Sequence, residues 1–269
     1  GTGTAGRPLF QKFGYTQDIN SIQPYQDTTY DSLQATLIRR WAGSIFGFVY
    51  TYSKAINYAD NDANPRIQYL PEAQHNKGLA GYDRRNNIQI YGVIDLPFGK
   101  GKRWADTGWA NHLLGGWQVN AIASKMSGTP INIVQGNGFN LNAGGSGQYP
   151  DQVKPTVVIL GGHGPGLPWF DRSAFAIVNI PAGQPQRFGT ASRNYVIGPG
   201  FFNIDAGLFK TIPIREWMKL QLRVEVLNLT NHPNYGNPNG DINNANFGII
   251  TSTIGIGERN TRFAARLTF

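Results

Sequence analysis

The chain has 269 residues and no cysteine, which excludes a disulfide framework and thiolate metal sites. Its formal net charge of +8 comes from scattered Lys and Arg, so the charge does not indicate nucleic-acid binding. The 34 glycines, 12% aromatic and only 15% charged residues are typical of a β-rich protein with many loops. No apolar run approaches the roughly 18 residues of a membrane helix, whereas the strands of a membrane barrel need only about 9–11 alternating residues.

Residues 1–28 are expected to form an irregular N-terminal segment or external loop. Gly1-Thr-Gly-Thr-Ala-Gly6 matches the G-x-G-x-x-G pattern of dinucleotide-binding proteins. No strand precedes it, and Arg7-Pro8 is expected to block the helix that such a site requires. We therefore expect no cofactor there.

The next segment predicts a β-hairpin. From Tyr30 to Arg39, apolar and polar side chains alternate with the period of a strand. Arg40-Trp-Ala-Gly43 predicts a tight turn, and Ser44–Ile56 predicts the returning strand with four aromatic side chains on one face.

A long polar loop is predicted from Asn57 to about Arg85. Asp60-Asn61-Asp62 offers alternating oxygen ligands, so Asp60 and Asp62 are candidates for a Ca²⁺ site. The loop lacks the Gly and the distal Glu of an EF-hand, so a solvated loop without metal is the favoured interpretation.

Two further strands are predicted at Asn86–Pro97 and Trp117–Val134, joined by a medium connection over 98–116. The glycines of that connection lack the G-K-[ST] of a phosphate-binding loop and a following helix, so they predict a turn. Residues 135–200 are expected to be mostly irregular, with a short strand at 157–160 and a single turn at 171–175. Loops of this length are usually functional or disordered.

The last three strands show the clearest alternation. The fifth runs from Phe202 to near Pro213, and a turn at 214–216 leads into the sixth, which begins at Met218. The polar face of the sixth strand is expected to line a watery lumen with Lys219, Arg223 and Glu225. These residues are expected to form a charge network in which the polar groups of the barrel wall find partners. After a polar loop over 230–258, Thr261–Phe269 alternates apolar with basic or polar residues and ends on an aromatic side chain.

Taken alone, the final strand fits the edge of a soluble β-sandwich as well as a membrane barrel. The connections favour the barrel, because short ones (40–43, 98–116, 214–216) alternate with long ones (57–85, 135–200, 230–258). Up-and-down strands would place all short turns at one end and all long loops at the other. Five tryptophans lie in or beside the short turns, where an interfacial aromatic girdle belongs: Trp41, Trp104, Trp109, Trp117 and Trp217.

The predicted fold is therefore all-β: antiparallel up-and-down strands of a transmembrane β-barrel, with about seven strands in residues 29–269 and long external loops. Seven strands make only a partial barrel, so we expect a piece of a longer protein or a chain whose open edges pair with other chains. The four histidines are widely separated and no nucleophile motif is present, so no enzymatic activity, metal or cofactor is expected.

Several motifs together resemble the C-terminal barrel of TonB-dependent outer-membrane receptors, in particular the Oar-like group with a carboxypeptidase-regulatory-like domain. The resemblance covers the chain from about residue 27 to the end. It is carried by Asp95-Leu-Pro-Phe-Gly-Lys-Gly101, Gly116-Trp-Gln-Val119, Ser127-Gly-Thr-Pro130, Phe202-Asn-Ile-Asp205, Leu208-Phe-Lys210, Glu225-Val-Leu-Asn-Leu-Thr-Asn-His232 and Phe269.

The resemblance implies a bacterial outer-membrane location and uptake or export of a large substrate. The implied partners are outer-membrane lipid, the barrel-assembly machinery, and an energy-coupling inner-membrane complex that acts through an N-terminal plug missing from this chain. Arg262, Ala264, Leu267 and Phe269 look like the family's assembly signal, with Ala264 where Gly is usual. The alternative is a structural or adhesive surface protein that self-associates through open strand edges.

Overall fold

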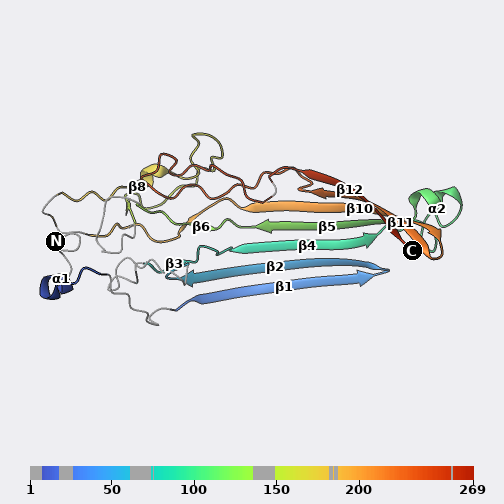
Figure 1. The fold of residues 1–269 in the computed structure, drawn as a ribbon, viewed down its shortest axis with the longest axis horizontal. Helices are drawn as coiled ribbons and strands as arrows, with labels where there is room; N and C mark the ends of the chain where they lie inside the picture. The colour runs from blue at the N-terminus through green and yellow to red at the C-terminus, as the bar shows by residue number, and fades with distance from the viewer. Residues whose placement is uncertain are drawn as a thin grey trace.

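The computed structural model describes residues 8–17, 27–60, 74, 76–135, 149–181, 184, 187–255 and 257–269. Long strands are joined by short turns at one end of the molecule and by long loops at the other (Figure 1). The long strands are β1 (Thr29–Trp41), β2 (Ser44–Asn57), β4 (Asn86–Asp95), β5 (Trp117–Met126), β10 (Phe201–Arg215), β11 (Met218–Leu227) and β12 (Asn260–Thr268).

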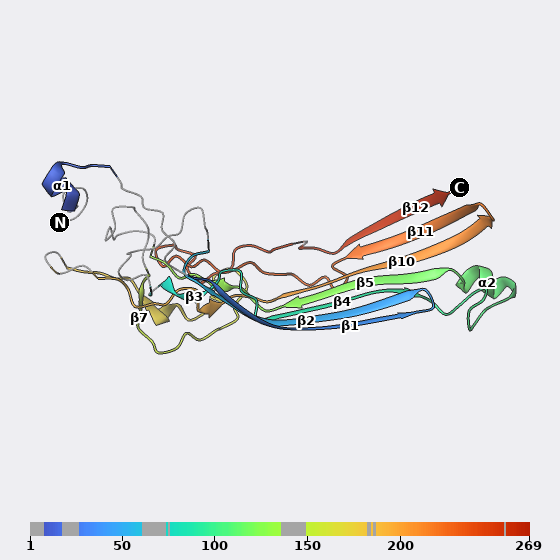
Figure 2. The same ribbon diagram turned by 90° about the horizontal axis from the view of Figure 1, so that it is seen from below.

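These strands form one antiparallel sheet in the order β1-β2-β4-β5-β10-β11-β12, with the two-residue β3 (Gly78–Leu79) added to β2. Each long strand pairs with the next long strand of the chain, so the predicted up-and-down topology is confirmed. Strands β1 and β12 form the two edges, and every residue of both is exposed. The sheet is not closed within the described residues, as the separation of β1 from β12 in Figures 1 and 2 shows.

The register gives the sheet two chemically different faces. Side chains opposite each other in an antiparallel pair lie on the same face. On one face Phe48 pairs with Leu37 and Ile90, and Leu222 pairs with Ala265. On the other face Gln89 pairs with Ser124. We call the first the apolar face and the second the polar face.

The short connections contain more structure than the sequence predicted. Ala42 and Gly43 both have positive φ, as the two-residue hairpin between β1 and β2 requires. The connection over 98–116, predicted as a turn, contains helix α2 (Gly108–Leu114). Lys210 of β10 holds its C-terminal end, because its Nζ donates to the carbonyl oxygens of His112 and Leu113 at 3.0 Å and also to that of Gly115.

The long loops pack together around a hydrophobic core of their own. Phe170, Phe175 and Phe247 form an edge-to-face cluster, with ring centroids 5.3–6.0 Å apart. Ile131 and Ile133 complete the cluster from the segment after β5. The short loop elements are β6 (Pro130–Ile131) paired with β9 (Val196–Ile197), β7 (Asp151–Gln152) paired with β8 (Phe175–Ala176), and the 3₁₀ helix η3 (Arg172–Ala174).

A polar cluster joins these loops to the end of β2. The buried Arg193 Nη2 lies 2.6 Å from Asp60 Oδ2, and its Nη1 donates to Asn57 Oδ1 at 2.7 Å. The same carboxylate accepts from the backbone N–H of Gly81 and from Asn194 Nδ2. Residues more than 130 positions apart in the chain (193 − 60 = 133) are thus held together, so the loops are anchored to the sheet.

Three sequence predictions were wrong in their details. The fourth strand ends at Met126, not at Val134, because Gly128 and Pro130 interrupt it and Ile131 and Ile133 turn into the loop core. The fifth strand continues past Pro213 to Arg215, because a register irregularity between Pro213 and Arg215 accommodates the missing N–H. Pro8 does not block a helix, since helix α1 (Pro8–Phe13) begins at it, where no N–H is needed.

Truncating Phe170 is expected to loosen the loop core. Its side chain is fully buried (0% exposed), so Phe170→Ala is expected to lower the stability of the loop region by about 3–5 kcal/mol. Hydrogen exchange over residues 149–178 measures the effect. Leu167→Ala, at a position 56% exposed, is the control, and equal protection in the two variants would contradict the assignment of this core.

Acid is expected to release the loops from the sheet. Burial raises the pKa of Asp60, but the Gly81 N–H, Arg193 and Asn194 outweigh it, so its pKa is lowered from 3.8. Arg187 likewise lowers the pKa of Asp151. The pKa of each carboxyl is lower in the folded chain than in the unfolded chain. The ion pairs therefore stabilise the folded loops fully at a pH above the unfolded pKa, and this stabilisation is lost as the pH falls through the lowered, folded pKa.

The measurement is hydrogen exchange of the loops between about pH 5 and pH 2, corrected for the intrinsic rate. The loops of the wild-type chain are expected to lose protection from hydrogen exchange below pH 3.8. The Asp60→Asn variant is expected to show lower protection at neutral pH and a weaker dependence of protection on acid. Identical profiles would show that the Asp60–Arg193 pair does not anchor the loops.

Candidate functional site

The polar face contains many hydrogen-bonding side chains, with some large apolar ones such as Tyr91, Ile122 and Phe209 among them. Gln118 Nε2 donates to Asp95 Oδ1 at 2.9 Å, and Asn203 Nδ2 donates to Asp205 Oδ1 at 2.9 Å. These polar pairs run across neighbouring strands and along them, so the face is suited to contact with water. Its register also includes Gln34, Thr51, Asn87, Gln89, Asn120, Ser124, Thr211 and Gln221.

The three residues predicted to line the lumen all lie on this polar face. Lys219, Arg223 and Glu225 are opposite Thr268, Ala264 and Arg262 of β12. Arg223 Nε donates to Gln221 Oε1 at 2.7 Å, and its guanidinium lies 5.0 Å from the Phe209 ring centroid. Arg223 is therefore engaged with its neighbours, whereas the charge network and the lumen role of the three residues stay predictions.

The apolar face extends from β1 to β12. On β11 it presents Leu220, Leu222, Val224 and Val226, and on β12 Phe263 and Leu267 lie opposite Val224 and Leu220. Phe263 is 79% exposed although it is large and apolar. A soluble sheet would cover such a face with a second layer, but none packs on it among the described elements, so the face suits contact with lipid.

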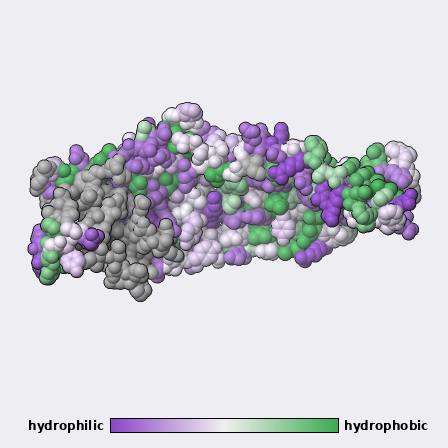
Figure 3. Space-filling model, in the orientation of Figure 1, coloured by the Kyte–Doolittle hydropathy of each residue, from purple (hydrophilic) through white to green (hydrophobic). Residues whose placement is uncertain are grey.

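The short-turn end gathers aromatic side chains, as the sequence predicted. Trp41 ends β1, Trp104 lies in the connection before α2, Trp109 lies on α2, Trp117 begins β5, and Trp217 lies in the turn between β10 and β11. Trp109 is 78% exposed. Figure 3 shows hydrophobic side chains at this end, over α2.

Sequence reasoning missed the cations that accompany these tryptophans. Four rings have a cation within 6 Å of their centroids: Arg39 over Trp41, Arg103 over Trp104, Lys210 over Trp117, and Arg215 over Trp217. In three of the pairs the Arg lies one or two residues before the Trp, so this spacing was a readable signal. Amphipathic rings with adjacent cations suit the level of lipid headgroups.

The residues of the predicted assembly signal share β12 but not one face. Leu267 lies on the apolar face, whereas Arg262 and Ala264 lie on the polar face. Phe269 follows the strand and is 87% exposed. A strand edge with an exposed terminal aromatic residue is accessible to another protein, and recognition by the assembly machinery stays a prediction.

The candidate metal residues are only partly described. Asp60 engages Arg193, Asn194 and Gly81, which compete with any cation for its oxygens. Asp62 lies outside the described residues. In the part of the chain that the structure describes, no group of three or more His, Asp or Glu could hold a metal ion.

The comparisons with known proteins agree with this arrangement. Residues 1–262 match the family described as Outer membrane beta barrel domain. No curated protein and no solved structure matches the chain. Among the described residues, no helix has the length and hydropathy needed to cross a membrane. Since the family match covers nearly the whole sequence, the chain belongs to the outer membrane beta barrel domain family and is an all-β protein of the bacterial outer membrane.

Proposed function

We propose that the chain takes part in TonB-coupled movement of a large substrate across the outer membrane, as part of an Oar-like receptor barrel. The observation that carries the proposal is the polar face, which extends across all seven long strands of the sheet. Seven strands already present a broad polar surface without closing on themselves, which suits a wide lumen better than a narrow one. The motifs at 95–101, 202–210 and 225–232 supply the resemblance to the receptors.

The structured loops support a role in substrate capture. Their core of Phe170, Phe175 and Phe247 and their anchor at Arg193 hold a large surface in place at one end of the sheet. A rigid surface loses less conformational entropy on binding than a mobile loop does. Within the predicted loop over 135–200, the described segments 149–181 and 187–200 are therefore our candidates for substrate selection.

The proposal includes three kinds of partner and assigns no enzymatic activity to the chain. Outer-membrane lipid would contact the apolar face, and the assembly machinery would read the end of β12 at Leu267 and Phe269. Energy would come from an inner-membrane complex that acts on a plug supplied by another segment or chain. Catalysis is not needed for any of these steps.

Two single-cysteine variants of neighbouring residues on β5 test both the orientation of the two faces of the sheet and the energy coupling. The chain has no cysteine, so single ones can be introduced without removing others from it. Ser124 lies on the polar face opposite Gln89 and Asn203, and its neighbour Ala123 lies on the apolar face opposite Ile90 and Ile204. In intact cells we expect a membrane-impermeant maleimide to label Ser124→Cys but not Ala123→Cys. Labelling of Ser124→Cys should fall when the proton gradient is dissipated or the energy-coupling complex is deleted.

The two parts of this experiment can fail separately. If labelling of Ser124→Cys is unchanged when the proton gradient is dissipated or the coupling complex is deleted, energy-coupled transport is refuted. The assignment of the chain to a membrane barrel is not affected by that result. Labelling of both cysteines in aqueous extracts, together with concentration-dependent assembly, would instead favour a self-associating surface protein. The exposed edges β1 and β12 are the observation that favours this second candidate.

A further inference from the structure

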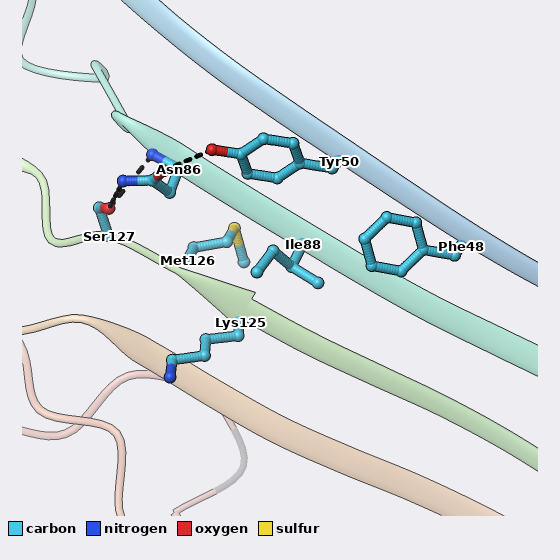
Figure 4. A pocket seen from close by; sticks show the side chains of 7 residues that line it. All are labelled: Phe48, Tyr50, Asn86, Ile88, Lys125, Met126 and Ser127. Carbon is cyan, nitrogen blue, oxygen red and sulfur yellow. Dashed lines mark hydrogen bonds between the residues drawn. The ribbon is translucent and has the colours of Figure 1, made fainter. Parts of the chain in front are cut away.

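A hollow of about 540 Å³ opens on the apolar face near the loop end of the sheet. Figure 4 shows its lining: Phe48 from β2, Ile88 from β4 and Met126 from β5 surround it with apolar atoms, and Lys125 lies at its edge. Its volume lies within the range of pockets that bind small ligands, about 300–1,000 Å³. A partly apolar ligand of modest size therefore fits it.

Lys125 is an unusual residue for this position. Its neighbours in register are Ile88 on β4 and Phe202 on β10, so no carboxylate lies opposite it. Within the described residues it makes no ion pair and no hydrogen bond, whereas Lys54 on the same face lies opposite Asp31. An exposed cation between two apolar neighbours is left for a partner outside the sheet.

The opposite rim of the hollow is polar and ordered. Tyr50 Oη donates to Asn86 Oδ1 at 2.9 Å, and Asn86 Nδ2 donates to Ser127 Oγ at 3.2 Å, as the dashed lines in Figure 4 mark. These bonds hold Tyr50, Asn86 and Ser127 in place between β2, β4 and the end of β5. The hollow thus has a fixed polar rim above an apolar floor, a composition that matches an amphipathic molecule.

The position of Lys125 relative to the tryptophan girdle fits a lipid headgroup. Eight residues of β5 separate it from Trp117 (125 − 117), which is roughly 27 Å along the strand. At a strand tilt of about 40° this corresponds to about 20 Å across a membrane whose apolar band is about 25 Å tall. A long Lys side chain near the edge of that band reaches the headgroups.

We propose that this hollow binds an anionic, phosphate-bearing lipid of the leaflet on the loop side, with an acyl chain against Phe48, Ile88 and Met126 and the phosphate on Lys125. The charge complementarity of Lys125 and the continuity of the hollow with the lipid-facing surface support this occupant. The inference rests on the outer-membrane location of the family and not on transport, so the two proposals can fail independently.

Native mass spectrometry of the detergent-solubilised protein tests the site. Phosphatidic acid and phosphatidylcholine with identical C12 chains are titrated separately, and we expect one tightly retained phosphatidic acid. Lys125→Gln is expected to weaken its binding about fivefold, the effect of one Lys at an anionic surface, and Lys125→Arg to restore it. Ile88→Ser should weaken the binding of phosphatidic acid with longer acyl chains more than it weakens the binding of the C12 form.

Lys54→Gln is the matched control, because Lys54 is an exposed lysine of the same face that does not line the hollow. The heat-dependent mobility of each variant in gel electrophoresis shows whether its barrel has folded. Unchanged binding in a folded Lys125→Gln protein, or equal retention of both lipids, would overturn the proposal. Displacement of phosphatidic acid by 10 mM inorganic phosphate would show a free-anion site and would also overturn it.

Discussion

The pairing of backbone N–H and C=O groups between antiparallel strands is the constraint on which the rest of this structure depends. A strand in lipid has no water to satisfy these groups, so its neighbours must do so. Once the pairs are fixed, the period of two assigns every side chain to a face. The pairing of Leu222 with Lys210 and Ala265, and of Arg223 with Phe209 and Ala264, shows that a slip of one residue on β11 would exchange the residues of its apolar and polar faces.

The same pairing separates the two ends of the sheet, and each end is stabilised differently. At the short-turn end, the Lys210 ammonium satisfies carbonyl oxygens at the end of α2 and also lies over Trp117. At the long-loop end, a hydrophobic core around Phe170 forms away from the sheet, and the Asp60–Arg193 pair anchors it. The molecule therefore combines a two-sided sheet that has no core of its own with a compact loop region that has one.

The edges of the sheet have a physical requirement of their own. Both β1 and β12 present backbone groups on the side away from the sheet, where the structure describes no neighbouring strand. In lipid such groups cost several kcal/mol each if they stay unpaired. Closure by further strands or pairing with another chain would meet this requirement, and the apolar and polar faces are compatible with either.

Much of the sheet could be predicted from the sequence, because alternation over ten residues is a local signal. The seven long strands, their topology and the grouping of short and long connections followed from side-chain period and turn residues such as Ala42-Gly43. The placement of Trp41 and Trp217 beside short turns followed too, whereas their role in an interfacial girdle stays a prediction. These features depend on residues close together in the chain.

Only the tertiary structure decided the features that join distant segments. The apolar pattern of Ile131 and Ile133 reads as a continuing strand, but burial against Phe170 and Phe247 competes successfully for these side chains. The Asp60–Arg193 pair and the hollow beside Lys125 depend on which strands become neighbours, and no local pattern encodes that. The sequence by itself determined the strands, their two faces and the membrane for which they are suited, because these follow from local alternation. The tertiary structure decided the loop core, the anchors and the hollow on the apolar face, because these arise where residues far apart in the chain compete for the same contacts.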